Sequence, residues 1–206
     1  MRNDTRKEIL GVAKKLFNER GYNNVSTRDI ANVLDISKGN LTYYFKKKED
    51  IIEALLTEAP NTRVKNAPKT LEELNFFFED MQKIVQENAF YFWHYTQFAE
   101  ISSTIQNMQF ETLNENQDLL EKTMLLLKEA GLVKEEQYVG EYKRLIDTLL
   151  LSCIYWVQFG LLKKTTEDNF LIQAWSIMYP FLSAAGIEAL NDIVSPEWFS
   201  KKQNNH

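Results

Sequence analysis

Apolar residues recur at helical spacing along most of the chain. Between residues 6 and 20 they follow Ile9 at the third, fourth, seventh and eighth positions, which places them on one face of a helix. The same spacing predicts further helices over residues 26–34, 37–45, 48–59, 70–88, 113–130, 136–162 and 167–191. Because no stretch alternates apolar and polar residues with the period of a strand, we expect an all-α fold.

Glycines, prolines and capping residues indicate where several of these helices begin and end. Ser26, followed three residues later by Asp29, approximates a capping box at a helix start. Gly21 and Gly131 stand where a glycine commonly ends a helix. Pro180 lies inside the last helical pattern and should kink that helix, because proline has no backbone N–H to donate.

Charge divides the chain into a basic head and an acidic body. Residues 1–52 carry 11 Lys and Arg against 7 Asp and Glu, whereas the remaining residues carry 13 against 22. The net charge of −5 therefore conceals a head with a balance of +4. This asymmetry favours contact of the head with an anion. We expect a head over residues 1–47, a body over residues 48–206 and a connecting helix over residues 48–59.

Composition and motifs exclude several classes of function. Cys153 is the only cysteine, so the chain cannot form an internal disulfide. The most apolar run, residues 149–162, is shorter than the roughly 20 residues that a membrane span needs, so we expect a buried helix and no membrane contact. We find no GxSxG, HExxH, phosphate-binding glycine loop or metal-ligand cluster around His94. We therefore expect neither an enzyme nor a metal or cofactor, and, without a signal peptide, a cytoplasmic protein.

Residues 37–50, SKGNLTYYFKKKED, combine lysines and tyrosines in one short segment. Two short helices joined by a tight turn, the second small and polar on its outer face, are typical of a helix-turn-helix. The second helix of such a unit enters the DNA major groove, where Lys38 could donate to guanine and Gly39 would allow close approach. Contacts with base edges or phosphates could also come from Asn40, Thr42, Tyr43, Lys46, Lys47 and Lys48. Taken alone, the three consecutive lysines are better explained by a solvated surface, but the whole arrangement favours the helix-turn-helix.

The sequence of residues 9–56 is ILGVAKKLFNERGYNNVSTRDIANVLDISKGNLTYYFKKKEDIIEALL. Its Thr-Arg-x-Ile-Ala, Ser-Lys-Gly and Tyr-Phe-x-x-Lys groups are spaced as in TetR/AcrR-type bacterial transcriptional regulators, and residues 5–56 resemble the DNA-binding domain of that family. The resemblance implies that Thr27 and Arg28 contact the DNA backbone, that Arg28 can reach a base, and that Lys48 holds a phosphate. Thr42 departs from the tyrosine that is common in the family, and Lys47 from a common Ser or Asn cap.

The body is rich in aromatic side chains. Residues 90–95 are all aromatic, and six consecutive residues cover every side of a helix, so one core cannot bury them all. The resemblance implies an effector pocket among the central helices. Its candidate lining is Phe77, Phe78, Met81, Trp93, Tyr95, Phe98, Phe110, Met124, Tyr155 and Phe159. For each of these residues taken singly, an ordinary place in the core is the better interpretation.

The resemblance also implies a homodimer that is formed by the last two long helices. The candidate interface residues are Leu145, Leu149, Ser152, Trp156, Leu162, Trp175, Tyr179, Leu182 and Gly186. A two-fold dimer would present two reading helices to half-sites about 34–36 Å apart on an inverted-repeat operator.

The sequence therefore predicts an all-α, homodimeric, sequence-specific regulator that binds double-stranded DNA through a three-helix head. The expected activity is that of a repressor released by a small, largely apolar or aromatic effector. An activator, or a regulator without an effector, is the alternative within the same class. A helical protein-interaction module with a basic head is the alternative from another class.

Overall fold

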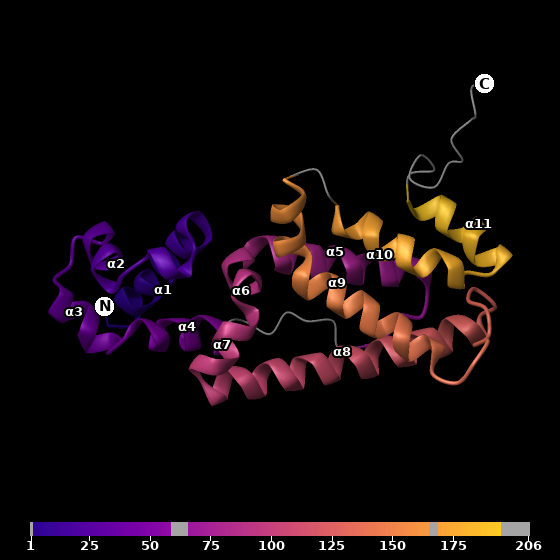
Figure 1. The fold of residues 1–206 in the computed structure, drawn as a ribbon, viewed down its shortest axis with the longest axis horizontal. Helices are drawn as coiled ribbons and strands as arrows, with labels where there is room; N and C mark the ends of the chain where they lie inside the picture. The colour runs from indigo at the N-terminus through magenta and orange to yellow at the C-terminus, as the bar shows by residue number, and fades with distance from the viewer. Residues whose placement is uncertain (1, 59–65, 165–168, 195–206) are drawn as a thin grey trace, which may run out of the picture.

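The computed structural model describes residues 2–58, 66–164 and 169–194, and the chain forms an elongated assembly of helices with the head at one end (Figure 1). No strand occurs in these three ranges. The elements of the head are α1 (Arg2–Arg20), η1 (Tyr22–Asn24), α2 (Thr27–Val33) and α3 (Lys38–Tyr44), and α4 (Lys48–Thr57) is the helix that follows them. The elements of the body are α5 (Leu71–Glu87), α6 (Ala89–Trp93), α7 (Tyr95–Ile101), α8 (Ser103–Glu129), α9 (Glu141–Lys163), α10 (Phe170–Met178), η2 (Tyr179–Phe181) and α11 (Ala184–Ile193).

Several helix ends lie where the capping signals place them. Ser26 Oγ accepts from the Asp29 amide at 3.2 Å, and the Asp29 carboxylate accepts from the Ser26 amide at 2.8 Å, so the capping box is complete. Gly21 and Gly131 follow α1 and α8 with φ of 78° and 73°, a backbone conformation that favours glycine. The prediction of these three boundaries is confirmed.

The middle of the body differs from the expectation in two places. Helix α8 begins ten residues before the predicted start at 113, because Ser102 caps it by accepting from the Ile105 amide. The aromatic run of residues 90–95 does not form one helix, because the backbone leaves helical geometry at His94, between α6 and α7. Side chains satisfy the carbonyls at this break, since Gln109 donates to Tyr95 O and Gln158 donates to Phe92 O.

The last helical pattern contains a complete break rather than the predicted kink. Helix α10 ends at Met178, η2 contains Pro180, and α11 starts after Ser183, which accepts from the Gly186 amide at 3.0 Å. The segment between the helices pairs with the loop after α8 through an isolated antiparallel bridge between Val133 and Leu182. This pairing supplies backbone hydrogen bonds that a continuous helix would otherwise have made.

Gly186 permits the close approach of α11 to this loop, and we expect Gly186→Ala to destabilise the protein. A Cβ at Gly186 would lie 2.0 Å from Leu132 O, and a backbone atom cannot move aside as a flexible side chain can. The free energy of unfolding should fall by about 3 kcal/mol, as for other overpacked sites. Urea denaturation followed by circular dichroism measures the change.

Gly11→Ala is the matched control for this substitution. Gly11 lies in the interior of α1 with no atom within 4 Å of an added Cβ, so the same change should stabilise the protein by about 0.5–1 kcal/mol. Equal effects of the two substitutions would show that the contact with Leu132 does not constrain α11.

Two hydrophobic cores run through the molecule, and the first extends from the head into the body. It contains Ile9, Phe17 and Leu41 of the head together with Phe90 and Phe98 of α6 and α7. The second core fills the body between α5, α8, α9, α10 and α11. The head therefore packs against the start of the body through a continuous apolar contact.

Helix α9 is long and apolar enough to cross a membrane by length and composition, with a mean hydropathy of 1.7. Such a helix is weak evidence for a span, because a core helix has the same properties. One face of α9 lies in the second core through Leu145, Ile146, Leu149, Leu150 and Cys153. The expectation of a buried helix over residues 149–162 holds for this face only, because 28% of the apolar window is buried and the opposite face, with Leu151, Tyr155 and Phe159, is exposed.

Candidate nucleic-acid interface

Helices α2 and α3 form a two-helix unit whose second helix is anchored from one side only. The turn between them includes Asp35 in the left-handed region, with φ of 52°, and the Ile36 amide donates to Ala31 O at 3.0 Å. Ser37 caps α3 by accepting from the Asn40 amide at 3.1 Å. Leu41 is fully buried beneath α3, whereas the residues on its outer face are exposed.

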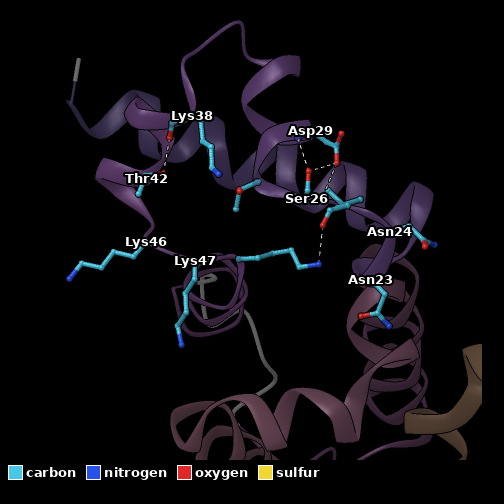
Figure 2. A pocket seen from close by; sticks show the side chains of 11 residues that line it. Asn23, Asn24, Ser26, Asp29, Lys38, Thr42, Lys46 and Lys47 are labelled. Atoms are coloured by element: carbon cyan, nitrogen blue, oxygen red, sulfur yellow. Dashed lines mark hydrogen bonds between the residues drawn. The ribbon is translucent and has the colours of Figure 1, made fainter.

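An open hollow of about 460 Å³ lies between η1, the start of α2, α3 and the turn into α4 (Figure 2). Six of the predicted DNA-contacting residues line it, namely Thr27, Lys38, Thr42, Lys46, Lys47 and Lys48. Figure 2 shows the side chains of Lys46 and Lys47 extending from the turn between α3 and α4. Residues that sequence reasoning did not assign to a site complete the lining, namely Asn23, Asn24, Val25, Ser26 and Asp29. A turn directly before the first helix of a helix-turn-helix unit was the signal that could have found them.

The other four predicted residues lie on the same elements outside the hollow. Arg28 is exposed on α2, and Gly39, Asn40 and Tyr43 are exposed on α3. An added Cβ at Gly39 would have its nearest neighbour at 3.8 Å, so no tight contact within the protein requires glycine there. Tyr43 packs edge-on against Tyr44, with ring centroids 5.2 Å apart.

Asp29 is the one carboxylate in the lining of this hollow, and hydrogen bonds hold it in place. Ser26 donates to it from both its hydroxyl, at 2.6 Å, and its backbone amide. These hydrogen bonds lower the pKa of Asp29 below its usual value, because they stabilise the ionised carboxylate. The hollow therefore combines four lysines with one fixed negative charge, and its balance is positive.

Lys48 differs from the other lysines because its own chain binds its ammonium group. Nζ donates to Tyr22 O and to Val25 O, both at 2.9 Å, and lies 3.9 Å from the centroid of the Tyr22 ring. Two of the three N–H donors of the ammonium group are therefore used within the chain, and its charge lies over the Tyr22 ring. Partial burial lowers the pKa of Lys48. The geometry favours a clamp between α4 and η1 over the phosphate contact that the family resemblance implies.

We expect Lys48→Ala to lower stability while leaving the salt dependence of DNA binding unchanged. Loss of two hydrogen bonds from a charged donor should reduce the free energy of unfolding by about 1–3 kcal/mol. The slope of binding affinity against salt should stay as in the unaltered protein, because no phosphate contact is removed. Urea denaturation and DNA-binding titrations at several salt concentrations measure the two quantities.

Lys46→Ala is the control for Lys48→Ala, because Lys46 is exposed in the same turn. We expect it to change stability by less than about 0.5 kcal/mol and to reduce the magnitude of the salt slope by about 1. The clamp is contradicted if Lys48→Ala reduces the salt slope in the same way and leaves stability unaltered.

Polar contacts reinforce the apolar junction between head and body. The side chain of Asn18 in α1 donates to Glu87 O at 3.0 Å and accepts from the Phe90 amide at 3.1 Å. Tyr22 meets the ring of Phe98 edge-on at 5.0 Å. Because Lys48 also contacts Tyr22, the clamp of the head adjoins the surface on which α7 packs.

The predicted effector-lining residues do not share one location. Phe77, Phe78 and Met124 are buried in the body core, and Phe98 is buried at the junction with the head. Phe110, Tyr155 and Phe159 are exposed, so their assignment to an enclosed pocket is corrected. Of the ten predicted lining residues, Met81, Trp93 and Tyr95 are half-buried.

The predicted dimer residues need a similar correction, because the chain buries many of them in its own core. Leu145, Leu149, Trp175, Leu182 and Gly186 are buried within the body. The side chains of Leu145, Leu149 and Trp175 face inward because α9 and α10 each use one face to cover α5 or its neighbours. Of the remaining candidates, Leu162 is exposed, while Ser152, Trp156 and Tyr179 are half-buried.

The outer face of α9 carries an apolar stripe formed by Leu151, Tyr155, Phe159 and Leu162. Their side chains are 57%, 45%, 52% and 81% exposed, in that order. At 100° per residue, the four positions fall within about 80° of the helix circumference. We call them the α9 stripe. Only Leu162 of the four was among the predicted interface residues.

Helix α3 is exposed apart from one buried face, and lysines lie at its start and after its end. This is the arrangement of a helix-turn-helix protein. Comparison with known proteins gives the family that the head matches within this class. A family model described as "Bacterial regulatory proteins, tetR family" matches residues 9–55.

Curated relatives match the same part of the chain. The HTH-type transcriptional regulator QacR of Staphylococcus aureus is 49% identical over 49 residues, which are 24% of this chain and 26% of that protein. The probable HTH-type transcriptional regulator YttP of Bacillus subtilis is 36% identical over 58 residues, 28% of each chain. The chain thus matches only about a quarter of the length of these relatives.

Solved structures match nearly the whole fold. A TetR-family transcriptional regulator from Marinobacter aquaeolei has a TM-score of 0.75 and 24% identity, with 92% of this chain and 97% of that chain covered. A γ-butyrolactone receptor (ArpA-like protein) has a TM-score of 0.63 and 17% identity, with 94% and 95% covered. Residues 9–55 thus match the sequence model of the TetR family, and head and body together have the fold of solved TetR-family regulators.

Proposed function

We propose that this protein is a homodimeric, cytoplasmic repressor that binds an inverted-repeat DNA operator and leaves it when a small apolar or aromatic effector binds the body. The observation that carries the proposal is the hollow beside α3. Lys38, Lys46 and Lys47 line this hollow, and all three are exposed to solvent. Lysines at this place suit phosphates along the backbone and base edges in the major groove.

The α9 stripe supports the dimer. A contiguous apolar surface on one helix is suited to burial against a second copy, and a two-fold axis would bring the same four side chains of both copies together. Such a dimer would direct two copies of α3 to successive major grooves.

The effector part rests on the body and on similar proteins. A matched structure with a TM-score of 0.55 and 14% identity is a SmeT–triclosan complex, so a similar fold holds a small molecule. An effector releases DNA only if it binds one arrangement of the two heads more tightly than the other. Helices α6 and α7 pack on the head through Phe90 and Phe98, so a change in the body caused by the effector can move the head.

Selection of bound sequences from random DNA at about 0.15 M salt tests the DNA-binding part. We expect enrichment of an inverted repeat with half-site centres one helical turn apart, about 34–36 Å. A protein-interaction module would enrich no sequence, and its weak DNA binding would vanish with a modest rise in salt. An activator would enrich a repeat as a repressor does, and a reporter gene behind that operator distinguishes the two.

We expect Lys38→Ala to relax sequence preference at one base position of each half-site. Lys38 is exposed at the N-terminal end of α3, where a donor can reach a guanine, and each such contact is worth about 1–3 kcal/mol of discrimination. Repeating the selection with the variant measures the preference. If the variant loses affinity equally for all sequences, Lys38 contacts phosphate instead of a base.

A further inference from the structure

Among the residues that the structure describes, two buried side-chain polar atoms have no hydrogen-bond partner, Trp93 Nε1 and Gln158 Oε1. Trp93 ends α6 and Gln158 lies on α9, and these two helices pack against each other. A buried polar atom without a partner is costly, and native proteins rarely keep one without a reason.

The orientation of the Gln158 amide follows from its neighbour. Its Nε2 donates to Phe92 O, a carbonyl left without a helical partner because α6 stops at Trp93. A carbonyl can only accept, so the nitrogen must face it and Oε1 must face elsewhere. The two unpartnered atoms are therefore one donor, the indole N–H, and one acceptor, the amide oxygen.

Aromatic side chains are present on both helices of the α6–α9 contact. Tyr91 and Phe92 are 5.2 Å apart between ring centroids, and the ring of Tyr95 lies nearly parallel to that of Phe92. On the α9 side, Trp156 meets Phe170 edge-on at 5.7 Å. Apolar walls with a few polar groups are usual for small-molecule sites.

We propose that Trp93 Nε1 and Gln158 Oε1 are the polar anchor of an effector site for an aromatic molecule that carries a hydroxyl group, that is, a phenol. A hydroxyl can accept from the indole N–H and donate to the amide oxygen, while the ring packs among the aromatic side chains. This inference rests on the effector part of the proposed function and names the class of effector.

The site has a short connection to the head. Trp93 lies three residues after Phe90, whose amide donates to Asn18 and whose ring packs on Phe17 in α1. A molecule that moves the C-terminal end of α6 at Trp93 therefore acts on a helix whose N-terminal end is hydrogen-bonded to the head.

A pair of probes that differ only at the hydroxyl tests the anchor. The probes are 4-methylphenol and 1,4-dimethylbenzene, which have similar shape. We expect 4-methylphenol to bind about tenfold more tightly by calorimetry, as the net gain from two hydrogen bonds predicts. It should also shift the indole N–H signal of Trp93 in a ¹⁵N-labelled protein. The signal is assigned by its loss in the Trp93→Phe variant.

Trp93→Phe keeps an aromatic ring and removes the N–H, so the preference for 4-methylphenol should disappear. Trp156→Phe is the matched control, because Trp156 is also half-buried but is not one of the unpartnered groups, and it should keep the preference. Circular dichroism verifies that both variants fold.

Equal binding of the two probes, an unmoved Trp93 signal, or no binding at about 1 mM would overturn the proposal. The signal in the unaltered protein decides the matter even if a variant does not fold. Selection of an inverted repeat, which needs no effector, tests the regulator separately, so failure of the anchor and failure of the proposed function are distinguishable.

Discussion

Phe159→Arg should convert the proposed dimer to a monomer and weaken binding to an inverted-repeat operator by about 100-fold or more. Phe159 lies inside the α9 stripe and is 52% exposed in the single chain. In a two-fold interface the substitution would bury two unpaired charges, one from each copy. A residue that dominates an interface contributes about 2 kcal/mol or more to the binding free energy, which is about 30-fold in affinity. The loss of DNA affinity follows because two linked half-sites bind far more tightly than one.

Sedimentation equilibrium gives the mass in solution, and a titration with the selected operator gives the affinity. Phe110→Arg is the control, because Phe110 is 66% exposed on α8 and lies outside the α9 stripe. We expect Phe110→Arg to remain a dimer. A monomer from Phe110→Arg together with a dimer from Phe159→Arg would move the interface to α8.

Trp175→Ala should unfold a large fraction of the protein or lower its free energy of unfolding by about 3–5 kcal/mol. Trp175 is fully buried, packs edge-on against Phe78 at 5.4 Å and donates from Nε1 to Asn75 Oδ1 at 2.9 Å. The loss would be a large part of the roughly 5–15 kcal/mol that stabilises a typical domain.

Trp175→Phe separates the hydrogen bond from the packing. It keeps a ring in the core but leaves Asn75 Oδ1 without its donor, and we expect a loss of about 1–3 kcal/mol. Phe110→Ala, on the surface, should change stability by less than about 0.5 kcal/mol. Urea denaturation at fixed protein concentration measures all three. If Trp175→Ala keeps its stability but becomes monomeric, the original assignment of Trp175 to the dimer interface was right.

The head was predictable because its signals are local. The exchange of hydrogen bonds between Ser26 and Asp29, and the positive φ of Gly21, involve neighbours within a few residues, so the sequence carries them directly. The burial of Leu41 and Phe45 follows from helical period alone.

The role of Lys48 could not be read in this way. Its partners, the carbonyls of Tyr22 and Val25, are more than 20 residues away, and nothing in a lysine run says which ammonium faces a carbonyl and which faces solvent. Sequence resemblance implied a phosphate contact, while the folded chain brings Lys48 onto η1. Lys46 and Lys47, in the same run, extend outward.

The body shows the same limit on a larger scale. Its helices are rich in apolar residues on more than one face, so the period of the sequence does not tell which face meets the protomer's own core and which meets another molecule. Packing assigns Leu149 and Trp175 to the core and leaves Tyr155 and Phe159 outside. The break at Pro180 likewise became complete because the loop after α8 offered Leu182 a backbone partner.

The sequence by itself determined the all-α fold, the helix-turn-helix head and the candidate surface of that head, because those features depend on periodicity and on contacts between neighbouring residues. Only the tertiary structure decided which lysine is a clamp, which aromatic residues are exposed, and where Trp93 and Gln158 leave a donor and an acceptor unpartnered. Those outcomes depend on which distant helices pack together, and a single side chain takes its role from the partners that this packing brings to it.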